Sequence, residues 1–68
     1  MAKKIIWHRA ENGFIASAYG LFAEVRKHPD GGYKYVVSVD APEGFGNVVA
    51  RGHKLRLRDA KALAAAAF

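Results

Sequence analysis

The stretch LFAEVRKHPDGGYKYVVSVD, residues 21–40, decides the fold of this 68-residue chain. Its centre, His-Pro-Asp-Gly-Gly at residues 28–32, is a turn signal, because proline sets φ for a type I turn and glycine accepts a positive φ. Residues 33–40, directly after the turn, are rich in the β-branched and aromatic types that favour strands. The stretch therefore predicts a β-hairpin with strands at residues 21–27 and 33–40.

The hairpin also predicts which side chains are buried, because the side chains of a strand alternate between the two faces of a sheet. The core-facing residues of the two strands are Leu21, Ala23, Val25, Tyr35, Val37 and Val39. The opposite face carries Phe22, Glu24, Arg26, Lys34, Val36, Ser38 and Asp40. An exposed sheet face that combines cations with aromatic and apolar side chains is a candidate surface for nucleic acid.

Shorter signals before the hairpin extend the sheet. Residues 5–8 predict a short strand, and Asn12-Gly13 is a strong signal for a hairpin turn. Residues 14–27 are too many for one ordinary strand. Gly20 therefore divides them into two strands or bends a single one.

The sequence after the hairpin predicts a loop at residues 41–47, a brief edge strand at residues 48–50 and a helix at residues 58–68. Alanine, the best helix former, fills much of the last segment. Trp7 and Tyr19 are expected to fill the core, because so small a domain needs large side chains inside. Helical spacing places on one face Leu57, Ala60, Leu63, Ala64, Ala67 and Phe68.

This order of elements predicts an α+β fold, a three- to four-stranded antiparallel sheet with one C-terminal helix packed on one face. The chain is expected to form a single domain over residues 1–68. Hydrophobic residues make up 51% of it, too many for a disordered tail. The absence of cysteine excludes disulfides, thiol nucleophiles and cysteine-ligated zinc. No apolar run has the length of a secretory signal or a membrane helix, so we expect a cytoplasmic protein with no membrane partner.

The residues carry no pattern typical of an enzyme. The three histidines, His8, His28 and His53, fall in different predicted elements and lack the spacing of metal ligands. Ser17 and Ser38 lie inside predicted strands, outside any nucleophile motif. We therefore expect a protein that is not an enzyme, with no metal site and no cofactor.

The net charge of +5 favours an anionic partner, although a charge of this size also serves solubility. Five of the eleven Lys and Arg residues fall within residues 51–61, at the entrance of the predicted helix, where free backbone N–H groups also favour an anion. Leu55 and Leu57 alternate with these cations and are expected to anchor inward. The alternative is a solvated basic turn whose arginine stems cover apolar surface. The candidate anion-binding residues are Arg51, Lys54, Arg56, Arg58 and Lys61, extended by Arg26 and Lys34.

Two resemblances bear on function. The C-terminal segment resembles the end of double-stranded-RNA-binding domains, with matches at Gly52, Arg58, Ala60, Lys61, Ala64 and Ala65. It departs from their pattern at Lys54, Arg56 and Leu57, and the N-terminal helix of that family is absent. The whole chain is similar to small bacterial and phage proteins of strand–strand–strand–helix build, in Trp7, Gly13, Gly20, Gly32, Gly52, Ala60 and Lys61. Some proteins of that kind bind DNA, and others block a host enzyme or a CRISPR effector.

Three hypotheses follow. The first is a small basic module that binds nucleic acid through the Lys/Arg cluster at the helix entrance. The second is a phage-type inhibitor or adaptor that binds a protein, with the cluster on an acidic surface or in the nucleic-acid site of its target. The third is a structural homo-oligomer, because a free sheet edge can pair with a second copy.

Overall fold

The computed structural model describes residues 5–41 and 44–68, without the side chains of Ala41, Gly44 and Phe45. In this part of the chain, five strands and one helix follow in the order β1 (His8–Ala10), β2 (Gly13–Ala18), β3 (Leu21–Lys27), β4 (Tyr33–Ala41), β5 (Gly44–Lys54) and α1 (Leu57–Ala66).

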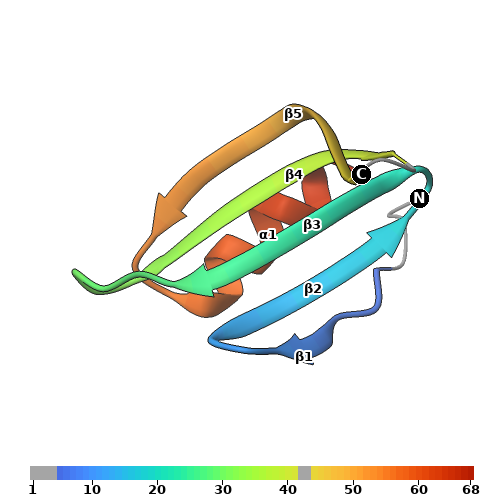
Figure 1. Ribbon diagram of the computed structural model, residues 1–68. Coiled ribbons are helices and arrows are strands. Elements are labelled where there is room, and N and C mark those ends of the chain that lie inside the picture. The colour runs from blue at the N-terminus through green and yellow to red at the C-terminus, as the bar shows by residue number, and fades with distance from the viewer. Residues whose placement is uncertain (1–4, 42–43) are drawn as a thin grey trace.

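The strands pair antiparallel in sequence order and form one meandering sheet, β1-β2-β3-β4-β5. Helix α1 packs across one face, against β3, β4 and β5, and lies behind the sheet in Figure 1. We call the opposite face, which no described element covers, the open face. The predicted α+β class and the C-terminal helix on one face are confirmed, but the sheet has five strands rather than three or four.

Tight turns account for the arrangement of the first three strands. Asn12 has a φ of 61°, and the turn pairs Ala10 with Gly13, so β1 runs up to Ala10 and lies later than the predicted strand at residues 5–8. Tyr19 and Gly20 have φ of 54° and 76°, both positive as in a type I′ hairpin turn, and they separate β2 from β3. Placing Tyr19 in the core was wrong, because this turn leaves it 58% exposed.

The largest correction concerns β5. Residues 44–47 belong to this strand and not to a loop, and the brief edge strand predicted at residues 48–50 is the middle of an 11-residue strand. The β4–β5 register shifts between Val37 and Ser38 and again between Ser38 and Asp40. A shift of this kind breaks the alternation that a sequence-based prediction needs. Residues 42 and 43 of the predicted loop lie outside the described residues.

The core lies between the sheet and α1. Its fully buried sheet residues, Ala23, Val25 and Val37, are three of those predicted, whereas Val39 is 39% exposed. From the helix side the core receives residues at a spacing of four, which are Ala60, Ala64 and Phe68. Leu63 lies off this stripe and is 40% exposed. Trp7 is half-buried against the core, as predicted.

Candidate functional site

The seven basic residues predicted to bind an anion are divided between the two sides of the sheet, because alternate side chains of a strand point to opposite faces. The open face carries Arg26, Lys34 and Arg51. The side of the helix carries Lys54 and Lys61, and the start of α1 carries Arg56 and Arg58. The cluster in the sequence is therefore not one flat surface in the structure.

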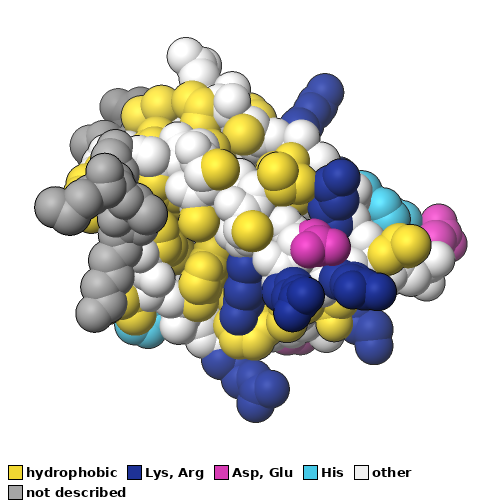
Figure 2. Space-filling model, turned by 180° about the vertical axis from the view of Figure 1, so that it is seen from behind, with side chains coloured by type: hydrophobic (Ala, Val, Ile, Leu, Met, Phe, Trp, Pro, Cys, Tyr) yellow, Lys and Arg dark blue, Asp and Glu magenta, His cyan; other side chains and the backbone are white. Residues whose placement is uncertain are grey.

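These residues nevertheless share one end of the molecule. There β3 and β5 end, β4 begins, and α1 starts directly after β5. Arg26 pairs with Lys34 across the sheet, and Lys34 pairs with His53. We call this surface the basic end, and it contains every Lys and Arg of residues 5–41 and 44–68, namely Arg9, Arg26, Lys27, Lys34, Arg51, Lys54, Arg56, Arg58 and Lys61. Figure 2 shows the Lys and Arg side chains on the helix side gathered toward this end, while hydrophobic side chains predominate over the rest.

The charge along the sheet is therefore uneven. Four carboxylates share the basic end with the nine cations, and these are Glu11, Glu24, Asp30 and Asp59. Among the described residues, the opposite half of the sheet has one charged side chain, Asp40. It accepts a hydrogen bond from Ser17 at 3.0 Å. The excess of positive charge thus lies at one end of the sheet, where the charge of an anionic partner is attracted most strongly.

One ion pair reduces this excess locally. Arg26 donates to Glu24 at 2.8 Å, and both side chains are on the open face. The hydrogen bond and the charge of Glu24 raise the pKa of Arg26, which keeps its positive charge at every physiological pH. Because Arg26 already has an anionic partner, it is the open-face cation least available to a ligand.

Lys61 also has a structural partner. Its ammonium lies 3.6 Å from the centre of the Phe14 ring and 5.9 Å from that of Trp7, both within the range of a cation–π contact. The side chain is half-buried and ties α1 to β2. Lys61 therefore contributes to stability as well as to the charge of the basic end.

The start of α1 has no side-chain cap. Arg56 occupies the N-cap position with extended φ and ψ of −105° and 137°, and it makes no capping hydrogen bond. Its carbonyl accepts the first helical bond, from the amide of Ala60 at 3.1 Å. Arginine cannot accept a bond from the free N–H groups of the first turn, which serine or aspartate would satisfy. Asp59 is the acidic residue of this turn.

The two leucines of the basic segment behave differently. Leu57 begins α1 and packs against the core, as predicted. Leu55 does not anchor inward, because β5 has ended at Lys54 and the chain bends before the helix. It is 81% exposed and stands between two cations of the basic end.

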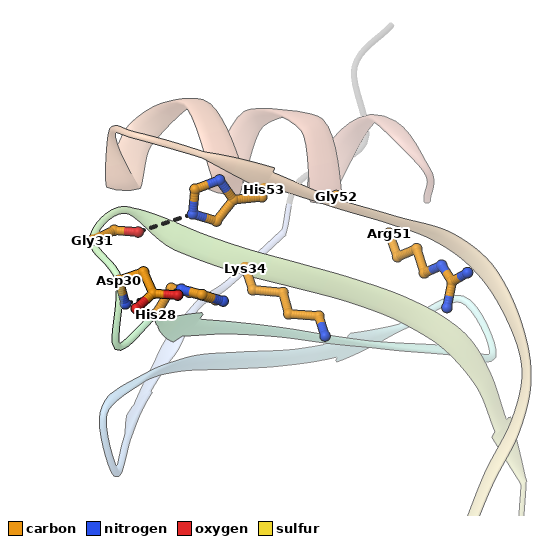
Figure 3. A pocket seen from close by; sticks show the side chains of 7 residues that line it. All are labelled: His28, Asp30, Gly31, Lys34, Arg51, Gly52 and His53. Carbon is orange, nitrogen blue, oxygen red and sulfur yellow. Dashed lines mark hydrogen bonds between the residues drawn. The ribbon is translucent and has the colours of Figure 1, made fainter.

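An open pocket of about 530 Å³ lies on the open face beside the turn between β3 and β4 (Figure 3). Lys34 of β4 and Arg51 of β5 line it and extend in the same direction, away from the turn. Lys34 is opposite His53 in the register, so Lys34 and Arg51 are diagonal neighbours, whose Cα atoms are typically about 7–8 Å apart. The remaining lining residues are His28, Asp30, Gly31, Gly52 and His53.

The sequence does not predict this pocket, because His28 and His53 lie in separate elements that only the pairing of the strands brings together. The two rings meet edge to face, with centroids 5.1 Å apart. Their contact depends on the pairing of Tyr33 with Lys54 at the end of β5, a strand that the sequence did not predict to extend so far. Gly32 is also required, because its Cβ position lies 2.9 Å from Nε2 of His53 and a larger residue would displace the ring.

A second, smaller hollow of about 220 Å³ lies at the same end, where β1 meets the first residues of β2. Its cations are Arg9 and Lys27, and its aromatic side chains are Phe14 and Tyr33. Phe14 is the ring that Lys61 covers. The basic end therefore contains two concave, positively charged surfaces.

Within the described residues, no group of three His, Asp or Glu side chains is placed to hold a metal ion. The one helix found there has neither the length nor the apolar character to cross a membrane. Comparison with known protein families, with curated proteins and with solved structures gives no match to this chain.

Proposed function

We propose that the protein binds nucleic acid through the basic end. The observation that carries the proposal is the confinement of all nine described Lys and Arg residues to one end of the molecule, formed by one half of the sheet and the first turns of α1. A surface that served only solubility would gain nothing from this confinement, because scattered charges keep a protein soluble equally well. A concentrated group of cations is suited to bind the backbone of a nucleic acid, which carries one negative phosphate charge for every nucleotide.

The two concave surfaces support the same partner. Cations line both, and the smaller hollow also contains the ring of Tyr33 beside that of Phe14, which Lys61 covers on one side. Backbone phosphates are contacted by cations, whereas exposed bases stack on aromatic side chains. A single strand, whose bases are accessible, satisfies both kinds of surface better than a duplex does. We therefore expect single-stranded DNA or RNA to bind more tightly than duplex of the same length.

The test is a fluorescence-polarisation titration of labelled single-stranded and duplex oligonucleotides at several salt concentrations. Nine cations against four carboxylates suggest about five phosphate contacts, so the logarithm of the affinity should fall with the logarithm of salt with a slope of about −3 to −5. The variant Lys34→Ala/Arg51→Ala should bind about tenfold more weakly and show a shallower slope. Absence of binding at low salt would overturn the proposal.

A matched variant separates the local surface from net charge. Adding Asp40→Asn and Asn47→Lys to Lys34→Ala/Arg51→Ala restores the net charge of +5, but places the charge in the opposite half of the sheet. Both added positions are exposed, so the fold should tolerate them. If the basic end is the site, this variant stays weak. Recovery of wild-type affinity would mean that net charge alone drives binding.

One observation favours a second candidate, a protein-binding inhibitor or adaptor. Leu55 is 81% exposed among the cations of the basic end, and an apolar side chain surrounded by charge is typical of a protein interface with a polar rim. Here the basic end would contact an acidic protein surface. A partner that remains bound to the protein after nuclease treatment supports this candidate against the first.

A further inference from the structure

The pocket of Figure 3 contains two histidines, whose charge depends on pH in a way that the charge of the surrounding Lys and Arg does not. The inference drawn from them rests on the proposed function. Histidine is the side chain whose charge changes between pH 5 and 8, whereas Lys and Arg stay charged throughout. A histidine in a phosphate site therefore makes anion binding depend on pH. The two rings differ in the hydrogen bonds that hold them, and therefore in whether a proton can be added without breaking one.

Hydrogen bonds assign the proton on His53. Its Nε2 lies 2.9 Å from the carbonyl oxygen of Gly31. A carbonyl oxygen only accepts, so Nε2 carries the hydrogen and donates it. The second nitrogen, Nδ1, is therefore unprotonated in the neutral ring, and it has no hydrogen-bond partner among the described residues. His53 can take up a proton at Nδ1 and lose no bond.

His28 is held in the opposite way. The backbone N–H of Asp30 donates to Nδ1 of His28 at 3.1 Å. Protonation of His28 at Nδ1 would break that bond. In addition, two charged imidazole rings 5.1 Å apart would repel each other. Of the two rings, only His53 leaves its Nδ1 without a hydrogen bond from a described residue.

Charged groups of both signs surround His53. Lys34 lies opposite it on β4, Arg51 is two residues before it on the same face of β5, and Lys54 is the next residue but points to the helix side. Asp30, from the turn, is the one carboxylate that lines the pocket. A bound phosphate would offset the positive charge of Lys34 and Arg51, so binding of the anion and uptake of the proton should strengthen each other.

We infer that this pocket binds one phosphate group through Lys34, Arg51 and His53, three of the residues that line it, and that proton uptake at Nδ1 of His53 strengthens the binding. The sign follows from charge. The phosphodiester keeps one negative charge between pH 8 and pH 6, while His53 changes from neutral to positive. The affinity for nucleic acid therefore rises as the pH falls across this range. Asp30 weakens binding at both values, because its carboxylate repels the phosphate.

The experiment measures the affinity of wild-type protein for a single-stranded oligonucleotide at pH 8 and at pH 6, at constant ionic strength. The expected gain is about three- to fivefold, the effect of one additional exposed charge pair. His53→Gln should remove the gain, and Asp30→Asn should raise the affinity at both pH values. His8→Gln is the matched control, because His8 is an exposed histidine on β1, at the opposite edge of the sheet from β5. It should keep the gain.

A second measurement does not depend on nucleic acid. Sulfate, whose charge is constant over this range, is titrated at pH 6 while the ring protons of the three histidines are followed by NMR. Saturable shifts at His53 and His28, with His8 unmoved, support the pocket as an oxyanion site even if oligonucleotides do not bind, in which case the proposed function alone fails.

Three outcomes would overturn the inference, and the first two leave the proposed function intact. One is oligonucleotide binding with the same affinity at pH 6 and pH 8. The second is a gain at pH 6 that persists in His53→Gln. Equal sulfate shifts at all three histidines would also overturn it, because they would indicate an unspecific effect of the ion.

Discussion

Val36 and Val37 are consecutive residues of β4 with the same side chain, but they serve opposite faces of the sheet. Val37 is fully buried beneath α1. Val36 is half-buried on the open face, where it lines a shallow hollow of about 160 Å³ with Phe22, Ser38 and others. Ser38 is only 3% exposed although no described element covers this face, so the open face is itself concave.

The difference separates stability from function. On the helix face, small and apolar side chains allow α1 to approach the sheet closely, and the buried ones cannot be altered without disturbing the core. On the open face, the two cations of the pocket lie near apolar residues that are only half-buried, so these residues contribute less to stability than the core does. Substitutions that test binding therefore belong on the open face and at the rim of the basic end.

The largest expected effect tests this separation directly. Val37→Ala should lower the free energy of unfolding by about 2–3 kcal/mol, since it removes two buried methyl groups and leaves a cavity. Val36→Ala, the matched change on the other face, should lower it by less than about 1 kcal/mol. Urea denaturation followed by circular dichroism measures both. Equal losses for the two variants would show that the open face is as much a part of the core as the helix face.

The next effect, smaller, concerns the helix start. Arg56→Ser should raise the free energy of unfolding by about 1 kcal/mol, because serine caps the first turn and arginine does not. The melting temperature would rise by about 4–8 °C. The same change removes a cation from the basic end, so oligonucleotide affinity should fall about threefold and the salt slope should decrease by about 1.

Arg58→Ser is the control for the cap. It removes an equal charge from the first turn of α1, one residue inside the helix, where serine cannot act as the N-cap. Its affinity should fall as for Arg56→Ser, with little gain in stability. If both variants gain equally, the relief of charge at the helix N-terminus, and not capping, is the cause.

Local signals made part of the fold predictable. The strands of residues 21–40 followed from a turn and an alternation that lie together in the sequence, and the buried positions Ala23, Val25 and Val37 followed with them. The end of β1 and the extent of β5 depend on pairing with other strands. In β5, glycines and a register shift hide the alternation, so a loop was predicted where the structure has a strand.

The same limit applied to the site. The cations of residues 51–61 were found because they lie close together in the sequence, and the structure adds that Arg9 and Lys27 lie at the same end. The contact between His28 and His53 could not be found, because it depends on how β4 and β5 are paired. Leu55 was misplaced because the alternation was extended through residues where the strand had already ended.

The smallest expected effect on stability, that of Leu55, sharpens the choice between the two candidate functions. Leu55→Ala should change the free energy of unfolding by less than about 0.5 kcal/mol, because the side chain is 81% exposed. Leu57→Ala, two residues later and packed against the core, should lower it by more than about 1 kcal/mol.

If the basic end acts on nucleic acid through charge, Leu55→Ala binds an oligonucleotide within twofold of wild type. A protein partner held by an apolar contact would instead lose about tenfold or more with this variant, while oligonucleotide binding stayed unchanged. Because the stability measurement identifies any variant that fails to fold, a selective loss at Leu55 would establish the apolar contact and favour the protein-binding candidate.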